Sequence, residues 1–257
     1  MDLSVIIVTY GRNEDCRDAI ESILRGEDLP REIIVVDDHP TEKFSYENPI
    51  VKVIHTEREI GISACRNLGI KISKGDVIAF LDDDVVVDKL WAREIINCFK
   101  DLSVGMVFGK INPLYLAPLP KWWDEEKFSW AVSVNKPAGA NFAVRKTVFE
   151  EVGNFKEELG IIKGKRFNLE DIEFRKRAEK ICKVVFCEKA LVYHKVPPYR
   201  LSRRYILRRY YSEGRGRRIL GTYKTRDAVK GILYSLIRFP RFHAVCNLVL
   251  WLGYLFG

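Results

Sequence analysis

Three adjacent carboxylates follow an apolar stretch near the first third of the chain. Asp82, Asp83 and Asp84 come directly after residues 77–81, which read Val-Ile-Ala-Phe-Leu. Such a run is typical of a strand buried on both faces of a parallel sheet, and open α/β sheets bind ligands at the carboxyl ends of their strands. Carboxylate oxygens suit Mg²⁺ or Mn²⁺, which would relieve the repulsion between neighbouring anions and often bind substrate phosphates as well. The trio alone is equally consistent with a metal site and with a solvated turn.

The elements that must position these carboxylates alternate between strand and helix as far as residue 110. Apolar runs predict strands over residues 3–9, 32–36, 51–55, 77–81 and 104–110, with helices over 13–25, 62–73 and 88–100. This alternation predicts βαβ units and a mostly parallel central sheet flanked by helices, in an α/β fold. The sequence has neither a Gly-x-Gly-x-x-Gly segment that opens a helix nor a Gly-Lys-[Ser/Thr] P-loop, so a dinucleotide-binding Rossmann site is not indicated.

After residue 110 the alternation ends and aromatic side chains become frequent. Residues 112–136 are expected to form a long loop that contains Trp122, Trp123 and Trp130. Exposed tryptophan rings stack on sugars or acceptor chains, so these residues are candidates for a substrate wall, although burial in a core is the favoured alternative. Further elements are expected downstream: a helix over residues 170–181 and strands over 184–187 and 190–194.

Charge and cysteine content limit the class of protein. The 257 residues include 43 Lys and Arg and 35 Asp and Glu, a net charge of +8. Residues 199–257 hold 13 of the basic residues and 2 of the acidic ones, so the rest of the chain is slightly acidic. The six cysteines form no Cys-x-x-Cys pair and the N-terminus does not resemble a signal peptide, which favours a cytoplasmic enzyme with reduced thiols.

The basic segment 199–257 is expected to be helical over residues 199–218, 225–238 and 242–257. Its charge indicates an anionic partner, either nucleic acid or a membrane surface. The apolar stretch 244–256 is too short to span a bilayer. It is consistent with an anchor at the membrane interface, and equally with a terminal helix packed on the domain.

Seven segments stand in the order found in family 2 glycosyltransferases with the GT-A fold, and over residues 3–218 the chain resembles that family. They are the opening strand and turn at 5–12, Asp37-Asp38, the segment 61–69 with Arg66, the Asp-x-Asp element at 82–84, Gly139-Ala140-Asn141, Glu170-Asp171 and His194. The resemblance implies a GT-A catalytic domain over residues 1–198, with a nucleotide-binding half (1–110) and an acceptor-side half (111–198). Residues 199–257 would then form a basic and apolar helical C-terminal extension.

The resemblance also implies a role for each matching residue. The nucleotide sugar would be bound by Thr9, Tyr10, Arg12, Asp37, Asp38, Arg66, Asp82 and Asp83. A Mn²⁺ or Mg²⁺ ion would be held by Asp84, Asp82 and His194. Asp171 would be the catalytic base, and Glu170 would orient the acceptor or steady the site. The acceptor side would include Gly139, Ala140, Asn141, Trp122 and Trp123.

Sugar transfer needs these residue types for identifiable reasons. Breaking a sugar–phosphate bond leaves a nucleoside diphosphate with new negative charge, which a divalent cation stabilises as the charge develops. Asp171 would take the proton from an acceptor hydroxyl that attacks the anomeric carbon opposite the leaving group, which inverts the configuration. Because a helix start favours a carboxylate's charge, Asp171 is expected to remain ionised. Asp38 would accept a hydrogen bond from the imide N–H of a pyrimidine.

The leading hypothesis is an inverting, metal-dependent glycosyltransferase that moves a sugar from a nucleotide-diphosphate donor to a hydroxyl of a glycan or lipid-linked acceptor. A UDP-sugar is the default donor, and peripheral contact with the inner face of the cell membrane is expected to involve residues 199–257. A sugar-nucleotide nucleotidyltransferase is an alternative, but its glycine-rich nucleotide loop is missing. A nucleic-acid-binding protein that uses the Arg/Tyr-rich tail is another; the acidic strand ends argue against it, since they would repel a polyanion.

Overall fold

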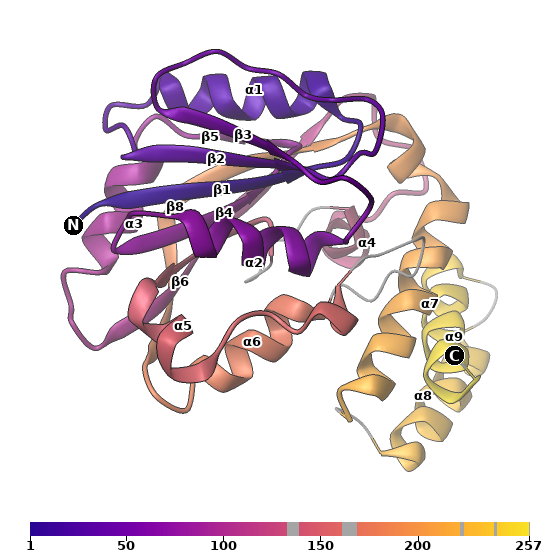
Figure 1. Ribbon diagram of the computed structural model, residues 1–257. Coiled ribbons are helices and arrows are strands. Elements are labelled where there is room, and N and C mark those ends of the chain that lie inside the picture. The colour runs from indigo at the N-terminus through magenta and orange to yellow at the C-terminus, as the bar shows by residue number, and fades with distance from the viewer. Residues whose placement is uncertain (133–138, 161–168, 222–223, 239–240, 257) are drawn as a thin grey trace.

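The fold is built on a mixed sheet in the computed structural model, which describes residues 1–132, 139–160, 169–221, 224–238 and 241–256 (Figure 1). Over these residues the strand order is β3-β2-β1-β4-β7-β6-β8-β5. The strands are β1 (Leu3–Thr9), β2 (Glu32–Asp37), β3 (Val51–His55), β4 (Val77–Asp82), β5 (Val85–Val87), β6 (Val104–Tyr115), β7 (Asn141–Arg145) and β8 (Lys183–Val196).

Four parallel strands, β3, β2, β1 and β4, form the N-terminal part of the sheet. Their register aligns the carboxyl ends, since Thr9 of β1 pairs with Asp37 of β2 and Val8 pairs with Asp82 of β4. Beyond β4, the strand β7 runs antiparallel to both of its neighbours, β4 and β6. Strand β8 is parallel to β6, and β5 is antiparallel to β8. The predicted α/β fold with a mostly parallel sheet is therefore confirmed, and its acidic strand ends share one edge.

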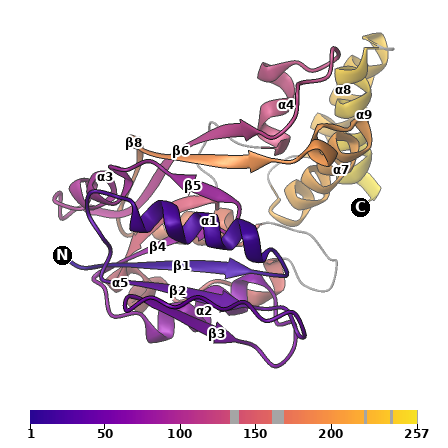
Figure 2. The same ribbon diagram turned by 90° about the horizontal axis from the view of Figure 1, so that it is seen from above.

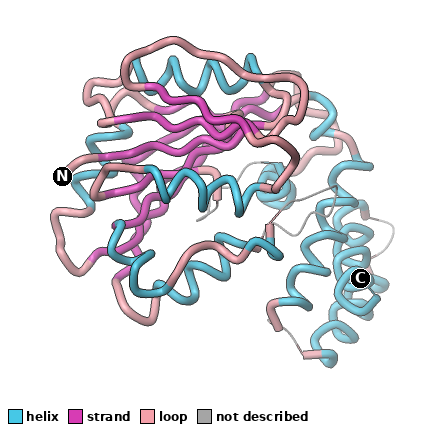
Figure 3. The backbone as a smooth tube through the Cα atoms, in the orientation of Figure 1, coloured by secondary structure: helices cyan, strands magenta, loops and turns pink. Residues whose placement is uncertain are grey.

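Helices cover both faces of the sheet because its strands are apolar on both sides. One core places alternate β1 residues such as Val5 and Ile7 against α1 (Asn13–Leu24) and α3 (Trp91–Cys98). The other places Ile6 against α2 (Ile62–Ile72), α5 (Lys146–Val152) and α6 (Glu170–Ala178). Figure 3 shows the sheet as the middle layer, with α1 above it and α2, α5 and α6 below in the orientation of Figure 1.

A helical unit stands beyond the carboxyl ends of β6 and β8 (Figure 2). It contains α4 (Glu125–Val132), α7 (Arg203–Ile219), α8 (Thr225–Ile237) and α9 (Phe242–Phe256). Short 3-10 helices η1 (Glu157–Leu159) and η2 (Pro198–Leu201) complete the described elements. The unit has its own core, which joins Phe128 of α4 and Val196 of β8 to Ile206 and Leu250. Residues on either side of position 198 therefore share one core, and a separate C-terminal extension stays a prediction.

The apolar C-terminal helix α9 packs on α7. This agrees with the expectation of a terminal helix packed on the protein, the alternative to an anchor at the membrane interface. A Cβ atom placed on Gly214 of α7 would overlap the carbonyl oxygen of Leu250, and one on Gly253 of α9 would overlap that of Tyr211. The two backbones therefore touch at glycines, which leaves Leu250 buried between them. Within the described residues, every helix is either too short or too polar to cross a lipid bilayer.

Four local expectations differ from the structure. The expected strand 104–110 continues to Tyr115, and the expected loop after it contains α4. The two strands expected at 184–187 and 190–194 are one strand, β8, in which residues 188–190 bulge out of the register with β6. Strand β5 was not expected, because three residues are too few to show a pattern and its partner β8 is distant in sequence.

Candidate active site

The central acidic turn is shaped by two strands that run in different directions. β4 ends at Asp82, and after a two-residue turn β5 pairs antiparallel with β8, so that Val85 lies opposite His194. The backbone carbonyl of Asp84 accepts a hydrogen bond of 2.8 Å from the Lys195 N–H. This pairing brings a histidine from the end of the sheet domain next to the carboxylates of the central strand.

Asp84 lies at the centre of three cationic or potentially cationic side chains. Its Oδ2 accepts hydrogen bonds of 2.9 Å from both Arg12 and Arg200, and its Oδ1 lies 3.0 Å from His194 Nε2. Burial alone would raise the pKa of Asp84, but His194, Arg200 and Arg12 hold that pKa well below its usual range. The carboxylate is therefore ionised at any physiological pH.

The residues expected to hold a metal fit a divalent cation. Asp82, Asp84 and His194 each offer one ligand atom, and these atoms lie within 4.8 Å of one another. Asp84 Oδ1 is buried, and His194 Nε2, 3.0 Å away, is its one polar neighbour among the hydrogen bonds and ion pairs of the described residues, so both atoms can turn to an ion. Two carboxylate oxygens and one imidazole nitrogen form a donor set compatible with Mn²⁺, and the carboxylates also suit Mg²⁺.

Asp83 points into the protein, away from Asp82. Its carboxylate accepts hydrogen bonds of 2.9 Å from Thr9 Oγ1 and 3.1 Å from Arg12, which tie the acidic turn to the end of β1. Burial raises the pKa of Asp83 to about 7. Tyr10 is exposed at the rim, with its ring 4.7 Å from the His39 ring. The structure thus gives Thr9, Arg12 and Asp83 a supporting arrangement, and their contact with a nucleotide stays a prediction.

The Asp37-Asp38 pair is buried and held by the loops that follow β2 and β3. Asp37 Oδ2 accepts a hydrogen bond of 2.8 Å from the Phe44 N–H. Asp38 accepts bonds of 2.8 Å from the Thr56 hydroxyl and the Gly61 N–H, at the start of α2. These bonds fix the shape of the loops above the sheet edge. To bind a nucleotide base, Asp38 would have to use carboxylate lone pairs that are not engaged by these hydrogen bonds.

Arg66 joins the acidic turn to the start of α6. Its buried guanidinium donates to Glu170 Oε1 at 2.8 Å and to the Gly139 carbonyl at 3.1 Å, and it lies 3.5 Å from Asp82 Oδ1. Asp82 is the most exposed of the three aspartates in the turn, so this carboxylate faces the open side. One guanidinium therefore links the proposed metal ligands with the proposed catalytic pair.

Asp171 lies in the first turn of α6, half-buried beside Gly139. A Cβ atom placed on Gly139 would lie 3.2 Å from Asp171 Oδ2, so a larger residue there would crowd the carboxylate. Burial raises the pKa of Asp171 to about 7, and the charge of Glu170 acts in the same direction while Arg66 opposes it. The helix start does not keep Asp171 fully ionised, contrary to expectation, because burial and the charge of Glu170 outweigh the charge of Arg66 and the hydrogen bond from the Ile172 N–H. Protonation of this side chain instead falls close to neutral pH.

The acceptor-side strand is positioned by Asn141, whose side chain is buried. Its amide accepts a hydrogen bond of 2.9 Å from Trp91 Nε1 and donates bonds to the carbonyls of Ala190 and Lys110. Both amide N–H groups are used within the sheet, and a role of Asn141 on the acceptor side stays a prediction. Ala140, the preceding residue, is buried at the base of the site.

Trp122 and Trp123 lie in the helical unit instead of forming an exposed wall. Both are half-buried, and the Trp122 ring packs 5.0 Å from Phe242 and 5.7 Å from Phe128. Trp123 Nε1 donates to Glu125 at 2.8 Å. These contacts favour the alternative interpretation, in which the tryptophans belong to a core, and an acceptor-side role for them stays a prediction.

Arg200 is a site residue that the sequence did not single out. It belongs to η2, directly after β8, and its guanidinium reaches both Asp84 and the vicinity of His194 Nε2, at 3.4 Å. The signal available in the sequence was weak: Arg200 is the second basic residue after His194, and it was grouped with a tail of many arginines. Its contact with Asp84 depends on a turn that brings residues 116 positions apart together.

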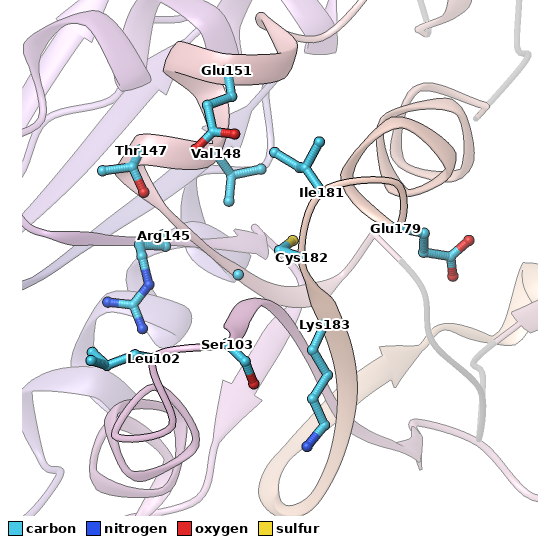
Figure 4. A pocket seen from close by; sticks show the side chains of 11 residues that line it. Leu102, Ser103, Arg145, Thr147, Val148, Glu151, Glu179, Ile181, Cys182 and Lys183 are labelled. Atoms are coloured by element: carbon cyan, nitrogen blue, oxygen red, sulfur yellow. The ribbon is translucent and has the colours of Figure 1, made fainter.

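A cavity of about 470 Å³ lies elsewhere, at the amino ends of β6 and β8 (Figure 4). Both basic side chains labelled there have structural partners: Arg145 donates to the Phe99 carbonyl, and Lys183 lies 3.3 Å from Asp101. None of the predicted site residues lines this cavity. The predicted site lies at the opposite edge of the sheet, where the parallel strands have their carboxyl ends.

Comparison with known proteins agrees with this arrangement. The profile of the family described as Glycosyl transferase family 2 matches residues 4–155. A glucosyl-dolichyl phosphate glucuronosyltransferase of Haloferax volcanii is 26% identical over 246 residues, which cover 86% of this chain and 77% of that protein. An uncharacterized glycosyltransferase of Bacillus subtilis, YwdF, is 40% identical over 89 residues, a third of each chain.

Two solved structures share the fold. That of GalNAc-T7 with UDP, GalNAc and Mn²⁺ superposes with a TM-score of 0.61 at 20% identity, over 76% of this chain and 43% of that one. That of Staphylococcus aureus TarS with UDP-GlcNAc superposes with a TM-score of 0.56 at 18% identity, over 82% and 66%. The chain thus spans less than two thirds of either neighbour. Since the family profile covers more than half of the sequence, the chain belongs to glycosyltransferase family 2 and is a glycosyltransferase of the GT-A fold.

Proposed function

We propose that the enzyme transfers a sugar from a UDP-sugar to a hydroxyl of a lipid-linked or glycan acceptor, with a divalent metal and inversion of configuration. The observation that carries the proposal is Arg66, whose guanidinium lies 3.5 Å from Asp82 and 2.8 Å from Glu170. The metal ligands and the base can then act on one sugar. Structural neighbours bound to UDP or UDP-GlcNAc support the donor class, and the Mn²⁺ in one of them supports the metal.

Each side chain would act on a definite part of the substrates. Asp82, Asp84 and His194 would hold Mn²⁺ or Mg²⁺, which stabilises the negative charge on the departing diphosphate. Asp171 would accept the proton of the attacking hydroxyl as the new bond to the anomeric carbon forms. Glu170, bound to Arg66, would keep the base in place without taking the proton itself.

Arg12 and Arg200 would support the metal site from the protein side. Both guanidinium groups bind Asp84 Oδ2, which leaves Oδ1 and His194 Nε2 facing each other. Two fixed cations also offset the negative charge that the donor diphosphate brings to an acidic turn. Tyr10, exposed beside His39, would border the nucleotide at the rim.

The acceptor class is proposed from the relative in Haloferax volcanii, whose name gives a dolichyl phosphate-linked sugar as its substrate. A lipid-linked acceptor would require the enzyme to work at a membrane surface. The basic C-terminal helices are compatible with peripheral contact there.

The test is a thermal-shift panel of nucleoside diphosphates with and without Mn²⁺, followed by hydrolysis of the matching sugar donor. The proposal expects a shift for UDP that needs the metal, and metal-dependent release of UDP from a UDP-sugar. Asp84→Asn and Asp171→Asn should abolish transfer while circular dichroism stays unchanged. A shift for every nucleotide without metal, or full transfer by either variant, would refute it; the anomeric configuration of the product, read by NMR, decides on inversion.

A further inference from the structure

Helix α8 has an apolar face that no other part of the described chain covers. Val229, Leu233, Leu236 and Ile237 are all exposed, Ile237 to 82%. Their spacing of four, three and one residues places them on one side of a helix. Figures 1 and 2 both show α8 at the outer edge of the molecule, away from the sheet.

The opposite face of α8 is the one that holds it to the protein. Ala228 and Ser235 are buried, and a Cβ atom on Gly231 would overlap the indole of Trp251 in α9. Packing therefore uses one face of the helix and leaves the aliphatic face to the outside. Four aliphatic side chains exposed on one helix face form the kind of apolar patch that marks a contact with a protein or a membrane.

The borders of this face are basic. Arg226 and Lys230 are exposed along α8, and Arg238 lies at its end with its guanidinium 4.2 Å from the Tyr234 ring centre. Asp227 is the acidic residue of the helix, and only Glu213 joins it among residues 199–257, against 13 Lys and Arg. A second copy of this surface would be repelled by the same charge, whereas an anionic surface would be attracted.

A cavity of about 320 Å³ lies at the C-terminal end of α8, where Tyr234, Ser235 and Arg238 meet residues of α4 and α9. Lys127, Arg238 and Arg241 supply cations to its lining, and Asp124, its carboxylate, is paired with Lys127. Burial lowers the pKa of His243 in the same cavity. The charges of Lys127 and Arg238 lower this pKa further, whereas the charge of Asp124 opposes them. The cavity thus has an excess of positive charge, and Arg238 of its lining directly follows Ile237 of the aliphatic face.

We propose that the aliphatic face of α8 and the basic mouth of this cavity dock the enzyme on an anionic lipid bilayer. Leu233 and Ile237 would enter the acyl boundary, while a lipid phosphate would approach Arg238 and Arg241. An amphipathic helix with aliphatic residues on one face and Lys/Arg at its borders binds membranes in this way. The inference deepens the proposed function, since it names the surface that meets a lipid-borne acceptor, yet its test does not depend on sugar transfer.

The experiment is co-sedimentation of the whole chain with vesicles of phosphatidylcholine alone or mixed with phosphatidylglycerol. The wild type should bind the mixed vesicles, and rising salt should weaken this binding. Leu233→Glu/Ile237→Glu should lower the affinity at least tenfold, and Arg238→Gln/Arg241→Gln should lower it about fivefold per arginine and flatten the salt dependence. Leu102→Glu is the matched control, because Leu102 is 84% exposed on the loop before β6 and should leave binding unchanged.

Other outcomes would overturn the proposal. Equal binding to both vesicle types, no binding to either, or unchanged binding by Leu233→Glu/Ile237→Glu would each do so. A change in oligomeric state in that variant, seen by analytical ultracentrifugation without vesicles, would assign the face to a second copy. Competition by millimolar inorganic phosphate as strong as that by lipid would assign the cavity to a free anion. All variants should keep metal-dependent donor hydrolysis, so loss of hydrolysis would count against the proposed function instead.

Discussion

The guanidinium of Arg66 lies 2.8 Å from the carboxylate of Glu170, although 104 residues separate the two in sequence. Both side chains are buried. Burial raises the pKa of Glu170, while the charge of Arg66 opposes this rise. The pair therefore fixes the start of α6 against α2, and with it the position of Asp171 relative to Asp82.

Removing the guanidinium of Arg66 should lower the free energy of unfolding. In Arg66→Met, Glu170 is left buried without its partner, and the expected loss is about 3–5 kcal/mol of unfolding free energy. The loss should shrink at acidic pH, where Glu170 takes up a proton. Urea denaturation at neutral and acidic pH measures both effects.

The double variant Arg66→Met/Glu170→Gln serves as the control for charge. It should recover much of the stability because no unpaired charge remains, but sugar transfer should stay lost because Asp171 is no longer held near Asp82. If the double variant is as unstable as Arg66→Met, the pair does not act through its charge.

The local parts of this site follow from the sequence, and the distant contacts do not. The apolar run 77–81 identifies β4 because a strand buried on both faces needs no polar alternation. The run also predicts that the three carboxylates after it lie at the end of this strand. The local sequence likewise predicts that a helix begins at Glu170. The antiparallel pairing of β5 with β8, which sets His194 beside Asp84, gives no local signal, since it depends on two strands far apart in the chain.

The contacts that the sequence does not reveal share a physical cause. The resemblance to the family places Asn141 on the acceptor side, and nothing near it in the sequence shows that its amide bonds to Trp91, Ala190 and Lys110. Arg200 was counted among the tail arginines, yet it binds Asp84. The number of hydrogen bonds that a polar side chain makes inside a fold is decided by tertiary neighbours, and sequence spacing does not reveal them.

The ionisation of Asp171 should govern the pH dependence of catalysis. Only the ionised carboxylate accepts a proton, and its pKa is raised to about 7, so kcat/KM should rise with pH through that value and then level off. Asp171→Asn should lower kcat by about 10²–10⁴-fold and remove this rise. Initial rates of UDP release at saturating donor and varied acceptor concentration, measured from acidic to alkaline pH, give kcat and kcat/KM and test both statements.

The buried carboxylate of Asp171 should also make the stability of the fold depend on pH. Because the folded-state pKa of Asp171 lies above its unfolded value, the folded state binds more protons, and this group destabilises the fold as pH rises from the ordinary carboxyl range toward 7. Asp171→Asn should therefore melt at a higher temperature than the wild type at alkaline pH and at nearly the same temperature at acidic pH. A variant that melts lower at alkaline pH would show that the carboxylate stabilises the fold.

Metal binding should depend on His194 and not on its neighbour. His194 Nε2 lies 3.0 Å from Asp84 Oδ1, whereas the Tyr193 side chain, one residue earlier in β8, points to the other face of the strand and is exposed. His194→Ala should weaken Mn²⁺ binding by about tenfold or more. Tyr193→Ala should leave it unchanged. Calorimetric titration with Mn²⁺ in the presence of UDP gives the affinities, and equal weakening in both variants would mean that the effect is on the strand as a whole.

Packing of the C-terminal helices should be sensitive to Gly214 and much less so to Gly216. An added Cβ at Gly214 would overlap the Leu250 carbonyl, which is backbone and cannot turn away, while one at Gly216 would meet the end of the Leu169 side chain at 2.8 Å. Gly214→Ala should therefore cost about 1–3 kcal/mol through overpacking. Gly216→Ala should be nearly neutral, because a small rotation of Leu169 makes room and alanine favours the helix by up to ~1 kcal/mol. Urea unfolding of the two variants compares the same substitution at two buried positions of α7. A larger loss of unfolding free energy in Gly216→Ala than in Gly214→Ala would mean that the contact of α7 with Leu169 is tighter than its contact with α9.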